Sequence, residues 1–168
     1  MKLTQKLTAI LAAVLTVALP AAARGATASG TFTVQATVNP TCTISGALLN
    51  FGNYDPNAAT PLNGSTTLTL TCTKSTGYSV ALTSANGATF GMKNTTNTLN
   101  YALYSDSART IVWDGTHPVA GTAPNRSPIT LNVYGQIAIN QDVPTGTPSG
   151  GVSPALTYTD TVTATVTF

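Results

Sequence analysis

The chain has 168 residues, of which only 7% are charged, whereas soluble domains average about 25%. Its few Lys and Arg are scattered, which excludes a nucleic-acid binder with a basic stripe, and helical-bundle runs of Glu, Lys, Leu and Ala are absent after residue 23. With no Glu and one His, an acid–base enzyme would have few titratable groups, whereas 33 Thr suit the surface of a sheet. The length predicts a single domain.

The N-terminal segment has the pattern of a secretory signal peptide. Lys2 and Lys6 precede the apolar run 7–19, and small residues provide cleavage sites after Ala23 or Ala28. The alternative, a membrane anchor, needs ~20 apolar residues, so we expect residues 1–28 to be removed and no membrane span to remain. This segment holds three of the seven basic residues, which leaves four basic and five acidic residues and a net charge near −1.

Cys42 and Cys72 are the only two cysteines of the chain. Export to an oxidising compartment favours a disulfide between them, and a closed loop of this length is worth roughly 3–4 kcal/mol. The alternatives are a metal site and a redox pair. Two thiols far apart in sequence, with one distant His, supply neither four zinc ligands nor a C-x-x-C motif.

Apolar and polar residues alternate with period two along the mature chain, which predicts half-buried strands with Thr on the outer face. The expected strands are 31–38, 67–73, 78–82, 99–103, 129–139 and 158–168. Turn signals separate them at Asp55-Pro56, Asn63-Gly64, Asn86-Gly87, Asp114-Gly115 and Pro124-Asn125, and 143–154 reads as a long loop. Strands spaced in this way predict an antiparallel β-sandwich.

Candidate chemical groups are few. Gly151-Val-Ser153 is a fragment of a nucleophile elbow without its last glycine or a following His. His117 is expected on a surface loop, and Asp114 in a turn that binds its own backbone. Trp113 is expected in the core, although an exposed Trp would stack on a sugar. We therefore predict no catalytic residue, no metal and no cofactor.

The segment before Cys42 has an unusual position. Phe32, Val34, Ala36 and Val38 alternate with polar residues, and Pro40 then interrupts the pattern. Such a strand either folds onto its own sheet or completes the sheet of a neighbouring copy, which is donor-strand complementation. A domain that lacks its own last strand leaves an apolar groove that would aggregate if left open.

Several motifs, taken in order, resemble the spore coat protein U family, which includes the archaic chaperone–usher pilins. They cover essentially the whole mature chain, with both cysteines in register. The matching stretches are Cys42-Thr-Ile44, Leu49-Asn-Phe51-Gly-Asn-Tyr54, Leu70-Thr-Cys72-Thr73, Tyr78-Ser-Val80-Ala-Leu82, Leu99 to Asp106 with Arg109 and Trp113, Val133 to Ile137 with Gln141, and Tyr158 to Phe168. Leu156 stands where the family usually has Gly. Ala155 and Thr167 replace the Gly and Tyr that mark the other pilin class.

The resemblance implies an incomplete, all-β immunoglobulin-like sandwich at 40–168 with a donor-strand extension at 29–39. It implies a structural, non-enzymatic subunit of a surface pilus that supports adhesion and biofilm formation. The implied partners are identical or homologous pilin subunits, a periplasmic chaperone and an outer-membrane usher. The implied donor residues are Phe32, Val34, Ala36 and Val38. The C-terminal residues Val162, Ala164, Val166 and Phe168 would edge the groove.

Two other functions remain open from the sequence. The first is a spore- or cell-coat protein with the same fold and a different assembly. The second is a secreted lectin-like domain with Trp113, Tyr101 and Tyr104 as a sugar platform. The placement of the strand before Cys42 discriminates, because a lectin would pack it on its own sheet.

Overall fold

The computed structural model describes residues 25–87, 89–146 and 149–168. The chain divides into two units, Met1–Ala36 and Thr37–Phe168, and every strand belongs to the second. Most of the predicted signal peptide, up to residue 24, lies outside the described residues. The described residues contain no helix, and hence none of the length and apolarity needed to cross a membrane.

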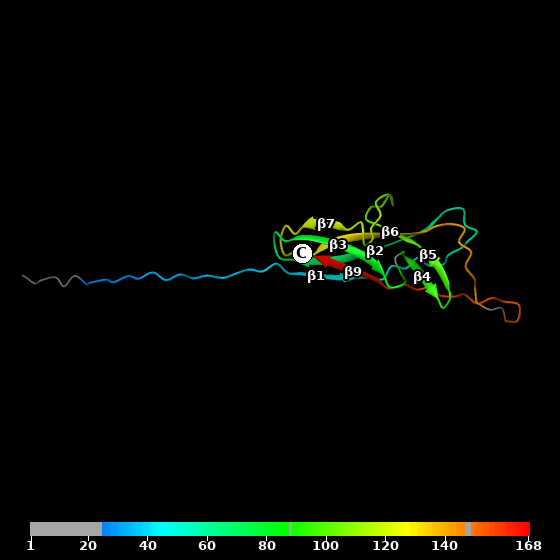
Figure 1. The fold of residues 1–168 in the computed structure, drawn as a ribbon, viewed down its shortest axis with the longest axis horizontal. Helices are drawn as coiled ribbons and strands as arrows, with labels where there is room; N and C mark the ends of the chain where they lie inside the picture. The colour runs from blue at the N-terminus through cyan, green and yellow to red at the C-terminus, as the bar shows by residue number, and fades with distance from the viewer. Residues whose placement is uncertain (1–24, 88, 147–148) are drawn as a thin grey trace, which may run out of the picture. The chain divides into compact units, whose positions relative to one another are not determined.

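Within the described residues, nine antiparallel strands form two larger sheets and one hairpin. The first sheet has the order β1-β2-β8-β6, the second has the order β7-β3-β9, and β4 forms a hairpin with β5 and a single bridge from Lys93 to Thr159. The bounds are β1 Cys42–Gly46, β2 Leu62–Cys72, β3 Gly77–Ser84, β4 Gly91–Asn94, β5 Asn97–Asn100, β6 Ala102–Tyr104, β7 Val119–Thr122, β8 Ile129–Ile137 and β9 Val162–Thr167 (Figure 1). The chain is thus an open all-β sandwich, as the sequence predicted.

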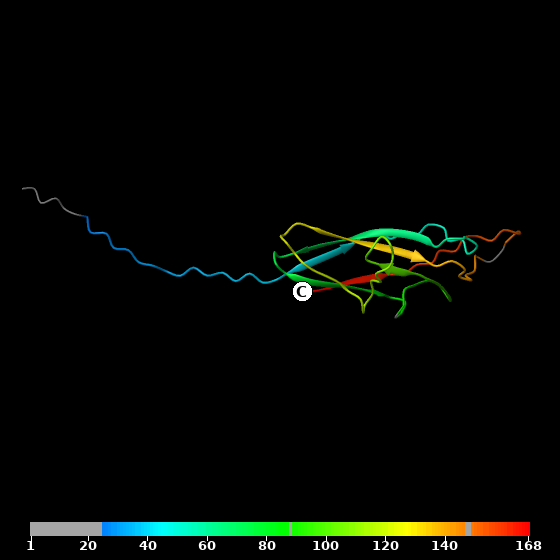
Figure 2. The same ribbon diagram turned by 90° about the horizontal axis from the view of Figure 1, so that it is seen from above.

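The core lies between the two larger sheets, because alternate residues of β2 and β3 point inward. Leu68 and Leu70 of β2 face Val80 and Leu82 of β3, and all four are at least nine-tenths buried. Figure 2 shows the two layers, with the yellow-orange β8 on one side and the red β9 on the other. Trp113 completes the core and is 1% exposed.

A pair of glycines shapes the end of the core near the start of β2. Gly64 of β2 lies directly opposite Gly135 of β8. The Phe51 ring occupies the space that their missing side chains leave, since a Cβ on Gly135 would lie 2.6 Å from the Phe51 Cζ. The same ring meets Tyr101 edge to face, with centroids 5.9 Å apart. Tyr54 then fixes the segment by donating a hydrogen bond to the Ala138 carbonyl at 3.0 Å.

Several sequence expectations need correction. Asn63-Gly64 is no turn but part of β2, because Gly64 is required opposite Gly135 beneath Phe51. The expected strand 99–103 is broken into β5 and β6 where the Tyr101 amide leaves the ladder and donates to the Phe90 carbonyl at 3.2 Å. The last strand begins only at Val162, and β1, β4 and β7 have alternations too short to stand out.

The expected strand 31–38 is in no sheet among the described residues. A period-two pattern specifies which side chains would share a face, whereas strand geometry also requires a partner for the backbone. The rest of the expected strands lie within or around β2, β3, β8 and β9.

Charge is confined almost entirely to loops and turns. Lys93 of β4 is the one charged residue in the nine strands of the described chain. The outer faces of β1 and β2 carry paired hydroxyl side chains instead, including Thr43 opposite Thr71 and Ser45 opposite Thr69. The Thr-rich alternation therefore makes a polar but uncharged outer surface.

Candidate functional site

The most informative feature is the seam between β1 and β9, the edge strands of the two larger sheets. The two strands contact each other, but each has a hydrogen-bonded strand on one side only, β2 for β1 and β3 for β9. They run in opposite directions, with the chain's C-terminus at the end where β1 begins (Figures 1 and 2). The seam therefore presents two free backbone edges, which is the arrangement that an added strand requires.

Core-facing side chains along the seam are incompletely covered. Ile44 of β1 lies opposite Leu70, which is 0% exposed, yet Ile44 itself is only half-buried. Val166 of β9 likewise lies opposite Val80, which is 0% exposed, and is half-buried. Leu70 and Val80 lie on inner strands and are covered by both sheets. Ile44 and Val166 lie on edge strands and lack a neighbouring strand on their outer side. The seam is thus an apolar strip that the chain leaves partly open.

The four predicted groove-edge residues all lie on β9 or directly after it, on the core-facing side of its alternation. Ala164 and Val166 pack against the core, whereas Val162 and Phe168 at the two ends remain exposed. A shallow cavity of about 490 Å³ adjoins Phe168 and is lined also by Val38, Pro40 and residues 73–77. The C-terminal strand therefore forms one whole border of the seam.

The other border is fastened by the predicted disulfide. Cys42 and Cys72 are opposite each other in the β1–β2 register and are bonded, which confirms the pairing. Next to them the Thr73 amide donates to the Thr41 carbonyl at 2.9 Å, and the Thr41 amide donates to the Thr73 hydroxyl at 3.1 Å. These contacts hold the start of β1 against β2 at the edge of the sheet.

A polar cluster around Asp160 fixes the entry to β9. Its carboxylate accepts hydrogen bonds from the Tyr101 hydroxyl and the Ser84 hydroxyl, both at 2.7 Å, and from the side-chain amide of Asn86 at 2.9 Å. Burial, followed by the hydrogen bond to Asp160, raises the pKa of Tyr101 well above its ordinary value. This role of Asp160 has no signal in the sequence, because its partners lie 59 to 76 residues away in the chain.

The predicted donor residues lie before β1 with their side chains uncovered. Phe32 is 87% exposed, Val34 82% and Val38 79%, and Ala36 is exposed as well. Large apolar side chains in this state are unfavourable in water and mark surfaces that bind a partner. The donor role itself stays a prediction.

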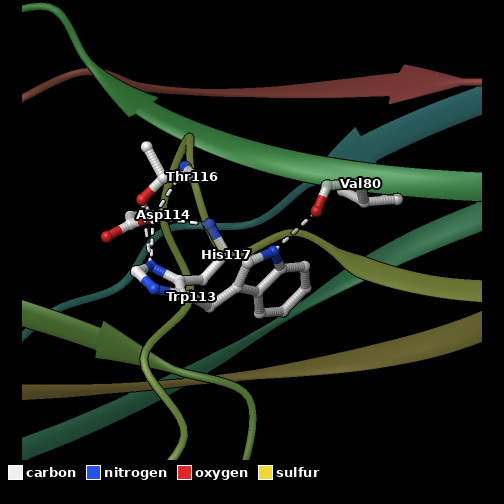
Figure 3. A network of polar contacts seen from close by, with 5 residues as sticks. All are labelled: Val80, Trp113, Asp114, Thr116 and His117. Atoms are coloured by element: carbon white, nitrogen blue, oxygen red, sulfur yellow. Dashed lines mark hydrogen bonds and ion pairs between the residues drawn. The ribbon is translucent and has the colours of Figure 1, made fainter.

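The loop that carries Trp113 and His117 has a structural role (Figure 3). The Trp113 indole donates to the Val80 carbonyl at 2.8 Å inside the core, so the sugar platform of Trp113, Tyr101 and Tyr104 is not formed. Asp114 accepts hydrogen bonds from the amides of Thr116 and His117. Desolvation opposes ionisation, but hydrogen bonds from these two residues outweigh it and lower the pKa of Asp114 to about 2.

No group of three or more His, Cys, Asp or Glu side chains with metal-binding geometry occurs among the described residues. His117 is an exposed loop residue whose ring Nδ1 hydrogen-bonds Asp114 and Thr116 in the same turn. Ser153 lies in an exposed loop, and every residue from 151 to 157 is exposed. The arrangement of these groups therefore offers no assembled nucleophile and base in the described parts of the chain.

Three of the matches found by comparison with known proteins differ in weight. A family model for the spore coat protein U domain matches residues 28–165. "Protein U" of Myxococcus xanthus is 34% identical over an alignment of 165 residues, gaps included, and the match covers 84% of this chain and 85% of that protein. A chain in the crystal structure of the CsuC–CsuE chaperone–tip adhesion subunit pre-assembly complex, from archaic chaperone–usher Csu pili of Acinetobacter baumannii, has a TM-score of 0.48 and 26% identity, with 79% of this chain covered.

The solved chain is much longer than the region it shares, since this chain spans 40% of its length. The family model, in contrast, extends over residues 28–165 and includes both cysteines, β1 and β9 up to Thr165. The match to Protein U of Myxococcus xanthus supports the family model, because it covers a similar share of both chains. The chain belongs to the spore coat protein U domain family and is a structural subunit, not an enzyme.

Proposed function

We propose that the chain is a structural subunit of a fibre on the cell surface, in which residues 29–39 of one copy fill the β1–β9 seam of the next. The observation that carries this proposal is the pairing of two incomplete features in one chain. The seam has two free strand edges over a partly open core, and the N-terminal segment has an uncovered apolar row.

Length and chemistry of the two features match. The six residues of β9 span ~20 Å at ~3.4 Å per residue, and residues 32–38 span about the same as a strand. Phe32, Val34 and Val38 would enter the core, and burying three large apolar side chains at ~1.5–3 kcal/mol each gives roughly 5–9 kcal/mol. Backbone hydrogen bonds to both seam edges would add to this.

The direction of the added strand follows from the connectivity. The segment enters β1 at Cys42, near the C-terminal end of β9 (Figure 2). A donor that runs parallel to β1 and antiparallel to β9 leaves the seam at the opposite end, where its own domain then sits. Each copy would therefore give at one end and receive at the other, and such head-to-tail contacts generate filaments.

Export and assembly complete this proposal. A periplasmic chaperone would occupy the seam before assembly, because an open apolar seam is an aggregation hazard. An outer-membrane usher would then exchange the chaperone for the next subunit, and the finished pilus would support adhesion and biofilm formation. Removing residues 162–168 should abolish co-purification with the chaperone, and unimpaired capture would refute this step.

The test of the fibre uses Phe32→Asp with Thr33→Asp as its matched control. Phe32 is 87% exposed, so its replacement leaves the donor's own fold intact, while the charge cannot enter the seam of a neighbour. Unboiled, non-reducing gels of the secreted parent protein should show a ladder that collapses to one band on boiling. The ladder should be lost in Phe32→Asp and kept in Thr33→Asp. A normal ladder from Phe32→Asp would exclude this segment as the donor.

A coat layer is the second candidate, favoured by the family description and by the relative named Protein U. Donor exchange would be shared, and the difference would be lateral association of the assembled chains. Negative-stain electron microscopy separates the two, because a pilus gives isolated filaments and a coat gives continuous sheets.

A further inference from the structure

A second site lies at the edge of the first sheet that is opposite to the seam. A cavity of about 380 Å³ is lined by Asn100, Tyr101, Ala102, Tyr104, Gln136, Ala138 and Gln141. Leu103 of β6 is buried, so its neighbours Ala102 and Tyr104 point to the outer face of the sheet. Gln136 lies opposite Ala102 in the β6–β8 register. The cavity is therefore on the outer face, at the β6 edge.

One wall of the cavity is held rigidly by hydrogen bonds. The Gln141 side chain bonds the backbone of Asn100 twice, since its carbonyl accepts from the Asn100 amide and its NH₂ donates to the Asn100 carbonyl, both at 2.7 Å. The backbone amide of Gln141 in turn donates to the Tyr54 hydroxyl at 2.9 Å. The site is consequently formed before any ligand arrives, which limits the entropy lost on binding.

The polar groups of the lining are amides and hydroxyls, and none of the lining residues is charged. The Gln136 side chain donates to Asn63 at 3.1 Å, which orients its amide and uses one of its four hydrogen-bonding positions. Asn100 contributes a second, exposed amide. Such groups pair with the hydroxyls of a neutral ligand, whereas a charged ligand would find no counter-ion in the lining.

Tyr104 supplies an aromatic surface beside these amides. Its cross-strand neighbour Tyr134 is already engaged, because the Arg109 guanidinium lies over that ring at 5.8 Å and donates to the Gly135 carbonyl at 3.2 Å. Tyr104 is half-exposed and lines the cavity. An aromatic body with a polar tip suits a ligand that has both an apolar face and hydroxyl groups.

We propose that this cavity binds a neutral saccharide, with a pyranose ring against Tyr104 and its hydroxyls bonded to the amides of Gln136 and Asn100. A purely apolar ligand would leave the remaining hydrogen-bonding positions of both amides unpaired, which costs binding energy. The volume is within the range of small-ligand pockets, which runs from roughly 300 to 1,000 Å³.

The cavity and the seam lie at opposite edges of the first sheet, at β6 and at β1, and Tyr101 of the lining connects them through its hydrogen bond to Asp160 at the entry to β9. A strand added at β1 therefore leaves the cavity open. Repetition along a fibre would convert a weak single-site affinity into strong multivalent attachment. The saccharide would come either from a surface glycoprotein or from a matrix glucan, and both present the same neutral pyranose chemistry.

Saturation-transfer-difference NMR on the mature protein tests the site, since the method works for single subunits and for assembled fibres. The probes are galactose, mannose and N-acetylglucosamine for glycoprotein glycans, cellobiose and maltose for glucans, and glucuronic acid as the charged control. We expect transfer to at least one neutral sugar with millimolar affinity and none to glucuronic acid. Tyr104→Ala and Gln136→Ala should each weaken binding about tenfold, the effect of ~1.4 kcal/mol.

Two further variants complete the design. Tyr104→Phe should retain binding because it keeps the ring, and Thr67→Ala, an exposed change on the outer face of β2, should leave it unaltered. Equal thermal unfolding temperatures for all variants exclude loss of fold as the cause. Absence of transfer to every neutral sugar, stronger binding of glucuronic acid, or undiminished affinity in both Tyr104→Ala and Gln136→Ala would overturn the proposal.

Discussion

Replacing Gly135 by Ala should destabilise the domain, although alanine is ordinarily the better residue in a strand. The added Cβ would lie 2.6 Å from the Phe51 Cζ and 2.9 Å from its Cε1, whereas carbon atoms pack at about 3.5–4.0 Å. The ring must therefore move by about 1 Å, away from its edge-to-face contact with Tyr101. Overpacking of this kind costs ~1–3 kcal/mol.

The conformational effect of the same change has the opposite sign. Glycine inside a strand is less favourable than alanine by roughly 0.5–1 kcal/mol, so the net loss at Gly135 should lie between about 0 and 2.5 kcal/mol, with ~1 kcal/mol at the centre of the two ranges. Gly77 of β3 is the matched control, because a Cβ there meets no atom within 4 Å. Gly77→Ala should stabilise the domain by up to about 1 kcal/mol.

The assay is urea unfolding of purified protein that lacks residues 1–28 and has the disulfide intact. Combining Gly135→Ala with Phe51→Leu should recover part of the loss, because leucine lacks the two ring atoms that the new Cβ approaches. The double-mutant cycle then measures the coupling directly. Stabilisation by Gly135→Ala equal to that by Gly77→Ala would refute the reasoning, since it would mean that Phe51 does not depend on the glycine.

Three further predictions concern the disulfide and two perturbed side chains. Replacing Cys42 and Cys72 together by Ser should lower the free energy of unfolding by roughly 3–4 kcal/mol, measured by urea denaturation; an unchanged midpoint would contradict a stabilising bond. The Asp114 carboxyl, with its pKa lowered to about 2, should stabilise the fold above pH ~4 and lose this effect as the pH falls from about 4 to 2. In thermal scans, the unfolding temperature of Asp114→Asn should fall less between about pH 4 and pH 2 than that of the parent protein. An equal fall in both proteins would exclude the Asp114 turn as the cause. The pKa of Tyr101 is raised in the folded state, so the neutral hydroxyl should stabilise the fold fully below pH ~10, and this contribution should be lost progressively at higher pH. Stability should therefore fall as the pH rises past about 10, and Tyr101→Phe should reduce this fall; an identical alkaline profile would argue against the buried hydroxyl.

The sequence predicted the architecture well where the local pattern and the tertiary environment agree. Long alternations around Leu70, Val80 and Val133 became central strands because both their neighbours and their inner face are present. Short strands such as β1 escaped prediction because Gly46 ends the alternation after two apolar positions. Their position is decided by pairing with β2, a long-range contact that no local window contains.

The candidate site was predictable in part. The disulfide followed from there being only two cysteines, and β9 followed from its strict Thr alternation. The seam required knowledge of which strands are edges, and that depends on the order of two sheets. The turn predicted at Asn63-Gly64 was wrong for a similar reason. The dipeptide is typical of turns, but its glycine pairs with Gly135 of β8, a long-range contact. Asp160 gathers its partners from two separate segments, 84–86 and Tyr101, and so has no local signature.

The near-absence of charge from the strands has a consequence for the environments in which the protein can persist. With Lys93 as the one charged strand residue in the described chain, sheet pairing depends on dispersion, apolar burial and backbone hydrogen bonds. Dissolved ions screen charges over ~10 Å at 0.1 M and over ~3 Å at 1 M, but they have little to screen here. A material made of such sheets should keep its mechanical integrity through dilution, evaporation and changes from fresh to saline water.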